Sequence, residues 1–144
     1  MILSGADVRQ YIQHGGLRFE PELAEDQFQQ NGVDLILDSV ADVPGDRPLL
    51  FLLGVTREFI TMPNDLMAFV QLRSTWARRG FMLPGTVIDA GFSGTITLEI
   101  VSFCEDHRVP VGERFAHLIF AKLTSPSEPY RGKYQGQVGI TGAR

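Results

Sequence analysis

The chain has 144 residues, of which 44% are hydrophobic and 21% charged, and its formal net charge at pH 7 is −4. This composition is typical of one soluble globular domain. Without an overall positive charge it is not expected to bind a nucleic-acid polymer. It contains no apolar run of the roughly 20 residues that a membrane-spanning helix needs, and no secretory signal is evident, so we expect no membrane contact and a cytoplasmic location.

The first predicted element is a short helix over residues 4–12. Ser4 can cap its amino end, and Asp7 can complete a capping box. Three apolar side chains then share one face of the helix: Val8, Tyr11 and Ile12.

The pattern changes to short strands from residue 33 onward. We predict strands over residues 33–37, 49–53, 55–60, 67–72, 95–103 and 115–123. Gly54 separates the second from the third. Between the predicted strands at 67–72 and 95–103 lies a short helix over residues 74–79, capped by Ser74 and stopped by Gly80. Many short strands with Gly, Pro and Asp turns predict an all-β sandwich or barrel over residues 1–124.

Residues 125–144 form a tail with little apolar content. We expect it to become ordered against a ligand or a neighbouring subunit. Its mixture of aromatic, cationic and amide side chains is typical of a lid over an anionic, aromatic ligand, and Tyr130, Lys133 and Gln137 are its candidate contacts. The alternative is a frayed chain end.

The segment from Arg73 to Arg78 is a candidate phosphate site. A helix amino end attracts anions, Ser74 can bond a phosphate oxygen, and both arginines offer forked, charged donors. The alternative is a capped surface helix whose two arginines are solvated.

Asp89 follows a short apolar run and is flanked by glycines. Its carboxylate could accept a bond from a sugar hydroxyl or a water, and Phe92 could pack on the sugar. The alternative is a turn in which Asp89 bonds its own backbone.

Glu99 lies in the middle of the most apolar strand, where residues alternate between the two faces and Thr97 shares its face. An acid in apolar surroundings can accept and return a proton near neutral pH. The alternative is a solvent-facing acid on a sheet with one wet face.

Several familiar sites are absent from the sequence. Neither the phosphate-binding loop G-x-x-x-x-G-K-[ST] nor the zinc deaminase signature H-x-E with P-C-x-x-C occurs. The single cysteine, Cys104, is interpreted as a small residue at a strand end. His14 and His107 are too scattered for a metal cluster, and His117 is interpreted as a satisfied core or interface histidine.

In their order along the chain, these segments resemble the dCTP deaminase family, a branch of the trimeric dUTPase superfamily. The resemblance runs nearly from end to end. Its motifs are MILS and DVRQYI at the start, QNGVDL at 30–35, Arg73-Ser74-x-x-x-Arg78, IDAGFxGxITLE at 88–99 and YRGKYQGQ at 130–137.

The resemblance implies a distorted β-barrel that assembles as a homotrimer with shared active sites. It implies catalytic roles for Glu99, as general acid and base, and for Asp89, which would hold the deoxyribose and position water. The implied substrate-binding residues are Arg73, Ser74, Arg78, Asp89, Phe92, Thr97, Tyr130, Lys133 and Gln137. Mg²⁺ would accompany the triphosphate of dCTP or dUTP, and no zinc would be needed.

The loop from Gly80 to Asp89 is about two residues shorter than in typical deaminases, and Pro84-Gly85-Thr86 looks more like the loop of trimeric dUTPases. The leading hypothesis is deamination of dCTP to dUTP, with or without further cleavage to dUMP. Two alternatives stay open: a dUTPase without deaminase activity, and a nucleotide-sensing regulatory protein with little turnover.

Overall fold

The computed structural model spans residues 1–144 and describes all of them except residues 46–48 and 104–107. Cys104 and His107, which the sequence analysis considered, lie outside the described residues. None of the helices in the described part of the chain has the length and apolarity needed to cross a bilayer.

The amino-terminal helix α1 (Gly5–Gln13) forms as predicted. The Ser4 hydroxyl accepts a bond from Asp7 N at 3.2 Å, and the Asp7 carboxylate accepts one from Ser4 N at 3.1 Å. Val8 is fully buried against the sheet. Tyr11 donates its hydroxyl to Asp65 at 2.8 Å, which ties the helix to the turn after the second long strand.

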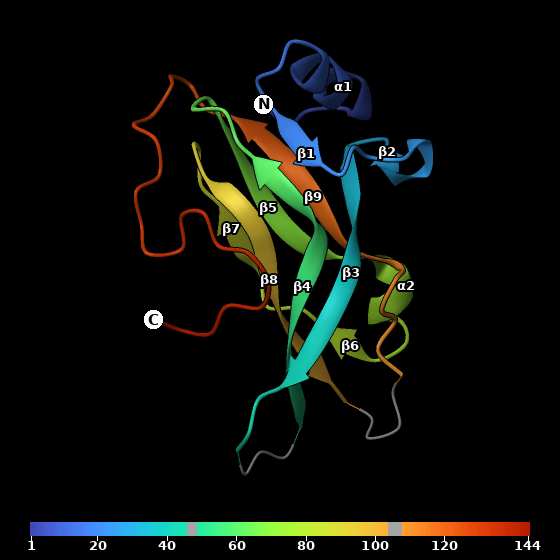
Figure 1. Cartoon of the computed structure of the whole chain (residues 1–144). Helices are drawn as coiled ribbons and strands as arrows, with labels where there is room; N and C mark the ends of the chain where they lie inside the picture. The colour runs from blue at the N-terminus through green and yellow to red at the C-terminus, as the bar shows by residue number, and fades with distance from the viewer. Residues whose placement is uncertain (46–48, 104–107) are drawn as a thin grey trace.

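Within the described residues, nine strands form one antiparallel sheet that curls into a half-barrel (Figure 1). The order along the sheet is β6-β8-β4-β3-β9-β5-β7, with β1 paired to β4 and β2 to β3. The strands are β1 (Arg18–Glu20), β2 (Phe28–Gln29), β3 (Gly32–Asp42), β4 (Leu50–Thr61), β5 (Leu66–Leu72), β6 (Phe81–Met82), β7 (Thr86–Ile88), β8 (Ser93–Ser102) and β9 (Arg114–Lys122). The helices besides α1 are α2 (Ser74–Ala77) and the 3-10 turn η1 (Glu25–Gln27). The predicted all-β fold is confirmed.

Strand β3 joins the two halves of the sheet. Its first residues pair with β9 and its last residues pair with β4, and the pairing shifts at Leu35/Ile36 and at Leu37/Ser39. Such bulges bend a strand, which lets β3 carry the sheet around the core. The largest core side chains lie inside this curl: Phe115, Phe120, Leu35, Leu98 and Ile100.

The prediction of a strand break at Gly54 is wrong, because β4 runs without interruption from Leu50 to Thr61. A Cβ atom at Gly54 would lie 2.7 Å from Leu37 Cδ1 and 2.9 Å from Ile100 Cδ1. Glycine is therefore used here to let three strands pack closely, and it does not end the strand.

Strands β5, β8 and β9 are confirmed near their predicted bounds, whereas β3 continues five residues beyond the predicted end at residue 37, to Asp42. The four short strands β1, β2, β6 and β7 have only two or three residues each, too few for a periodic pattern to predict. Helix α2 is shorter than predicted, and Ser74 is not its cap: Arg73 occupies that position without a side-chain cap bond, while Ser74 begins the helix. Gly80 ends the turn, as predicted, with φ of 87°.

Candidate active site

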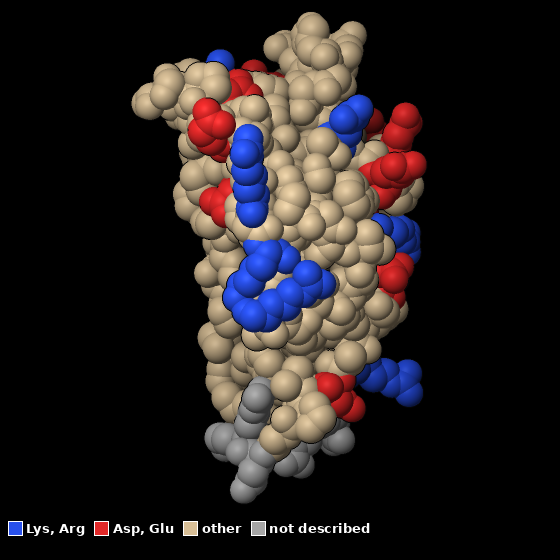
Figure 2. Space-filling view, turned by 60° about the vertical axis from the view of Figure 1, so that its left-hand side comes forward, with Lys and Arg blue, Asp and Glu red and all other residues tan. Residues whose placement is uncertain are grey.

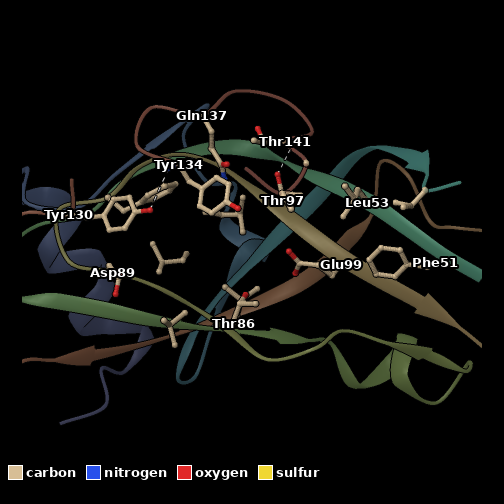
Figure 3. A pocket seen from close by; sticks show the side chains of 18 residues that line it. Phe51, Leu53, Thr86, Asp89, Thr97, Glu99, Tyr130, Tyr134, Gln137 and Thr141 are labelled. Carbon is tan, nitrogen blue, oxygen red and sulfur yellow. Dashed lines mark hydrogen bonds between the residues drawn. The ribbon is translucent and has the colours of Figure 1, made fainter. Parts of the chain in front are cut away.

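A pocket of about 590 Å³ lies between strands β4, β7 and β8 and the tail of residues 125–144 (Figure 3). Its described lining contains six of the residues singled out from the sequence: Asp89, Phe92, Thr97, Glu99, Tyr130 and Gln137. Segments far apart in the chain thus meet at one place, where the curled sheet leaves a gap between β7 and β8.

The alternation of β8 directs Thr97 and Glu99 into the pocket. Leu98 and Ile100, which lie on the opposite face, are almost completely buried in the core. The predicted facing of these residues is confirmed, and the face with Glu99 is that of a pocket and not of open solvent.

The end of the pocket at Glu99 is mainly apolar, with Thr86 and Thr97 as polar neighbours. Leu53 lies directly opposite Glu99 in the pairing of β4 with β8, and Phe51 faces the same way two residues earlier. Figure 3 shows Phe51, Leu53 and Glu99 together at this end, with Thr86 facing the Glu99 carboxylate and Asp89 at the far end. The pocket is long enough to separate two carboxylates with different surroundings.

Asp89 is presented by the tight turn after β7. Gly91 adopts φ of 76°, and Phe92 N donates to Asp89 O at 3.2 Å, which reverses the chain before β8. The Asp89 carboxylate is exposed and accepts no hydrogen bond from the described residues, so the alternative of a side chain bonded to its own turn is not what the structure shows. Phe92 is 7% exposed and packs edge-on against the Tyr130 ring, with centroids 5.8 Å apart.

The tail docks on the same subunit, which corrects the expectation that it needs a ligand or a neighbour to become ordered. Gln135 accepts from Ser93 N at 2.8 Å and donates to Gly91 O at 2.9 Å. Gln137 and Thr95 exchange bonds: Thr95 N donates to Gln137 O, and Gln137 Nε2 donates to Thr95 O, both at 2.9 Å. The tail therefore follows the first residues of β8 by backbone and amide hydrogen bonds.

The predicted tail contacts have different surroundings. Tyr130 and Gln137 line the pocket, although the Gln137 amide is also used to anchor the tail. Lys133 lies outside the lining; its ammonium donates to the Arg144 carbonyl and lies 5.2 Å from the centre of the Tyr134 ring. Basic side chains gather in the middle of the face that Figure 2 presents.

Arg73, Ser74 and Arg78 do not reach the pocket of their own chain. Ser74 is the first residue of α2, and Arg73 and Arg78 flank this helix, which lies on the other side of the view in Figure 1 from the tail. Arg73 forms an ion pair with the buried Asp34, with Nε 2.8 Å from Oδ2. The pocket is consequently lined, within the described chain, by two carboxylates and by no lysine or arginine.

Some lining residues were missed by the sequence analysis: Val43, Phe51, Leu53, Thr86, Tyr134 and Thr141. Tyr134 lay within the tail motif and could have been found there. Thr86 likewise lay in the quoted loop Pro84-Gly85-Thr86. Phe51 and Leu53 depend on how the curled sheet turns β4 toward the pocket, and a local pattern carries no such information.

The donor set for a metal ion is sparse. Among the described residues, no three His, Cys, Asp or Glu side chains cluster. Asp89 is an exposed carboxylate in the pocket, and Mg²⁺ prefers oxygen ligands of this kind. With so few protein ligands, the pocket fits an ion held mainly by phosphate oxygens and water.

The fold matches solved structures of nucleotide-processing enzymes. The dCTP deaminase of Agrobacterium tumefaciens superposes with a TM-score of 0.69 at 20% identity, over 85% of this chain and 47% of that one, so the present chain spans about half its length. A variant dUTPase of Staphylococcus bacteriophage 80alpha superposes with a TM-score of 0.56 at 14% identity, over 85% and 99% of the two chains. These likenesses define the fold as that of the dUTPase and dCTP deaminase enzymes.

Sequence comparison defines the family more narrowly. Residues 47–123 match the model of the dCTP deaminase-like family. The dCTP deaminase of Sulfurisphaera tokodaii is 41% identical, over 98% of this chain and 91% of its own length. A probable deoxyuridine 5'-triphosphate nucleotidohydrolase of Sulfolobus islandicus rod-shaped virus 1 is 42% identical, over 100% and 99%. The chain belongs to the dCTP deaminase-like family, as its motifs indicated.

Proposed function

We propose that the chain is a zinc-independent dCTP deaminase that converts dCTP and water to dUTP and ammonia, in the cytoplasm. The observation that carries the proposal is Glu99, an acid directed into a mainly apolar end of the pocket, while Asp89 lies at the other end. Close relatives named dCTP deaminase support the choice of substrate.

The geometry suggests how the substrate lies. The cytosine enters the apolar end beside Phe51 and Leu53, so that its C4 atom faces Glu99. The deoxyribose lies against Phe92 and near Thr97, with Asp89 accepting a bond from a sugar hydroxyl. The Glu99 carboxylate takes a proton from water, the resulting hydroxide attacks C4, and Glu99 returns the proton to the departing amino group, which leaves as ammonia.

The triphosphate needs cations that the pocket lining does not supply. We propose that Arg73, Ser74 and Arg78 of a neighbouring copy provide them in a homotrimer, and that Mg²⁺ accompanies the triphosphate. Within the same chain, Lys133 is the nearest basic residue of the tail motif to the lining residue Tyr134.

Residues 125–144 act, in this proposal, as a lid on the barrel of residues 1–124. Tyr130, Tyr134 and Gln137 already line the pocket, and the hydrogen bonds along β8 hold them there. A lid of this kind excludes bulk water and orients the substrate.

The decisive experiment incubates the protein with dCTP, and separately with dUTP, in the presence of Mg²⁺, and measures ammonia, dUTP, dUMP and pyrophosphate. We expect ammonia from dCTP. Glu99→Gln keeps the shape of the side chain but loses the base, so ammonia release should fall by roughly 10² to 10⁴-fold while dCTP still binds. Glu113→Gln, an exposed acid outside the pocket, is the matched control. Normal ammonia release by Glu99→Gln would remove Glu99 from the mechanism.

One observation favours a second function, cleavage of dUTP to dUMP and pyrophosphate. The viral relative carrying that name matches this chain along its whole length, and the short loop before Asp89 agrees with it. Pyrophosphate from dUTP without ammonia from dCTP would establish a dUTPase, both products would establish a bifunctional enzyme, and tight binding without either product would indicate a nucleotide sensor.

A further inference from the structure

Outside the pocket, three basic side chains surround one buried carboxylate. Asp34 of β3 exposes only 2% of its side chain. Arg73 Nε lies 2.8 Å from its Oδ2, and His117 Nδ1 lies 2.8 Å from its Oδ1. Arg114 Nη1 is more distant, at 3.6 Å from Oδ2, and its guanidinium is also paired with Asp26. Asp34 therefore makes its closest contacts with Arg73 and His117.

Strand pairing places this cluster. Asp34 lies directly opposite His117 where β3 pairs with β9, and His117 lies opposite Gln71 where β9 pairs with β5. Arg73 follows two residues after Gln71, and its backbone N–H is held by Phe115 O at 3.0 Å. Three neighbouring strands thus bring the arginine to the carboxylate without help from a flexible loop.

An ion pair with Asp34 and a hydrogen bond to the Arg114 carbonyl restrain the Arg73 guanidinium, although Asp34 Oδ2 accepts no hydrogen bond from the described residues. Nε is paired with Asp34, and Nη1 donates to the Arg114 carbonyl at 3.3 Å. Neither of these two contacts is made through Nη2, and 26% of the side chain is exposed. A planar guanidinium held in this way loses little freedom when its outer edge binds phosphate.

We propose that Asp34 is the positioning residue of Arg73, and that His117 in turn fixes the Asp34 carboxylate. The inference rests on the proposed function, in which Arg73 contacts the triphosphate. Asp34 itself touches no substrate: it acts by holding the arginine in the orientation that receives the β- and γ-phosphates.

The proposal makes a prediction opposite to that of simple charge attraction. Replacing Asp34 with asparagine removes a negative charge near a phosphate site, so Coulomb attraction alone predicts tighter binding of the triphosphate. If Asp34 positions Arg73, binding becomes weaker in spite of the added positive charge.

The test measures equilibrium binding of dCTP and of dCMP, which lacks the β- and γ-phosphates, to trimers that all carry Glu99→Gln so that nothing is turned over. Asp34→Asn should weaken dCTP binding by about tenfold or more and change dCMP binding by less than about threefold. In an Arg73→Gln background, Asp34→Asn should have no further effect on dCTP. Arg79→Gln, which removes a neighbouring cation outside the cluster, is the control and should leave the dCTP Kd unchanged.

Thermal melting shows whether each variant is folded. Should Asp34→Asn fail to fold, His117→Leu takes its place, with a smaller loss of dCTP affinity that also disappears in the Arg73→Gln background. Unchanged or tighter dCTP binding by a folded Asp34→Asn variant overturns the positioning role while leaving the proposed function intact. An Arg73→Gln variant that binds dCTP normally overturns both the positioning role and the assignment of Arg73 to the triphosphate, whereas the proposed deamination is tested separately by ammonia release.

Discussion

Glu58 shows how strongly a single residue is constrained by the bend in the sheet. It lies on β4, is 1% exposed, and accepts bonds from Ile36 N at 3.0 Å and Gln27 Nε2 at 2.7 Å. Burial raises the pKa of the Glu58 carboxyl above its ordinary value, and these hydrogen bonds offset only part of that rise. The acid joins β3, β4 and η1 at the point where the pairing of β3 shifts.

The raised pKa of Glu58 predicts a pH dependence of stability. The folded protein holds the Glu58 proton more tightly than the unfolded chain does. The free energy of unfolding therefore declines as pH rises from about 4 through the raised pKa of the folded state, and the effect is complete above it. Denaturant titrations across this range should show that Glu58→Gln lacks this part of the decline, whereas Glu22→Gln, an exposed acid, keeps it. Equal slopes in all three proteins would mean that Glu58 is not the group responsible.

Asp89 offers a second test at the residue scale. Asparagine can still accept a bond from a sugar hydroxyl, so dUTP affinity should change little. It cannot act as a base, so any dUTP cleavage should fall by a factor on the order of 10². Pyrophosphate release and dUTP affinity are to be compared for Asp89→Asn and the unaltered protein. A loss of equal size in both would make Asp89 a binding residue only.

Among the elements, the tail is held by hydrogen bonds to the first residues of β8 together with the packing of Tyr130 against Phe92. Gln135 accepts one of them from Ser93 N, and it also donates to Gly91 O in the turn before β8 and to the Tyr130 carbonyl within the tail, without lining the pocket. Substitution of Gln135 can therefore weaken the attachment of the lid without changing any residue that lines the pocket.

Removing the tail should abolish turnover and leave a folded barrel. Deletion of residues 129–144 takes Tyr130 and Tyr134 away from the pocket but removes none of the nine strands. Gln135→Ala should reduce kcat/KM by about 30-fold, because it removes the two hydrogen bonds, near 1 kcal/mol each, that join the lid to Ser93 and Gly91. Circular dichroism and product assays check both variants. Full activity of the truncated protein would show that the tail is no lid, and a truncated protein that fails to fold would show that it is structural.

The elements also show where local pattern is informative and where it is not. Period-two alternation correctly assigned β8 and the facing of Thr97 and Glu99, and the capping box correctly located α1. The prediction at Gly54 was wrong because glycine is needed there for the close approach of Leu37 and Ile100 from neighbouring strands, and a local pattern does not show this contact. The docking of the tail on its own subunit was missed because its partners are backbone atoms of β8, which leave no mark in composition. Phe51 and Leu53 were missed for a similar reason, since only the curl of the sheet turns them toward Glu99.

For the whole molecule, the separation of the pocket from Arg73 and Arg78 predicts an oligomer. We expect light scattering at micromolar concentration to give three times the 16.0 kDa mass of the chain. A monomer would contradict shared sites, and the triphosphate would then have to be neutralised by the tail and Mg²⁺ alone.

The separation of Glu99 in the pocket from Arg73, which is paired with Asp34, also has a genetic consequence. If each site takes Glu99 from one subunit and Arg73 from the next, two inactive proteins can rescue each other. Randomly mixed trimers of Glu99→Gln and Arg73→Gln chains in equal amounts would contain both intact residues in about a quarter of their sites, since each position is independently correct half the time. Co-expression of two null alleles would then yield a working enzyme that neither allele encodes by itself.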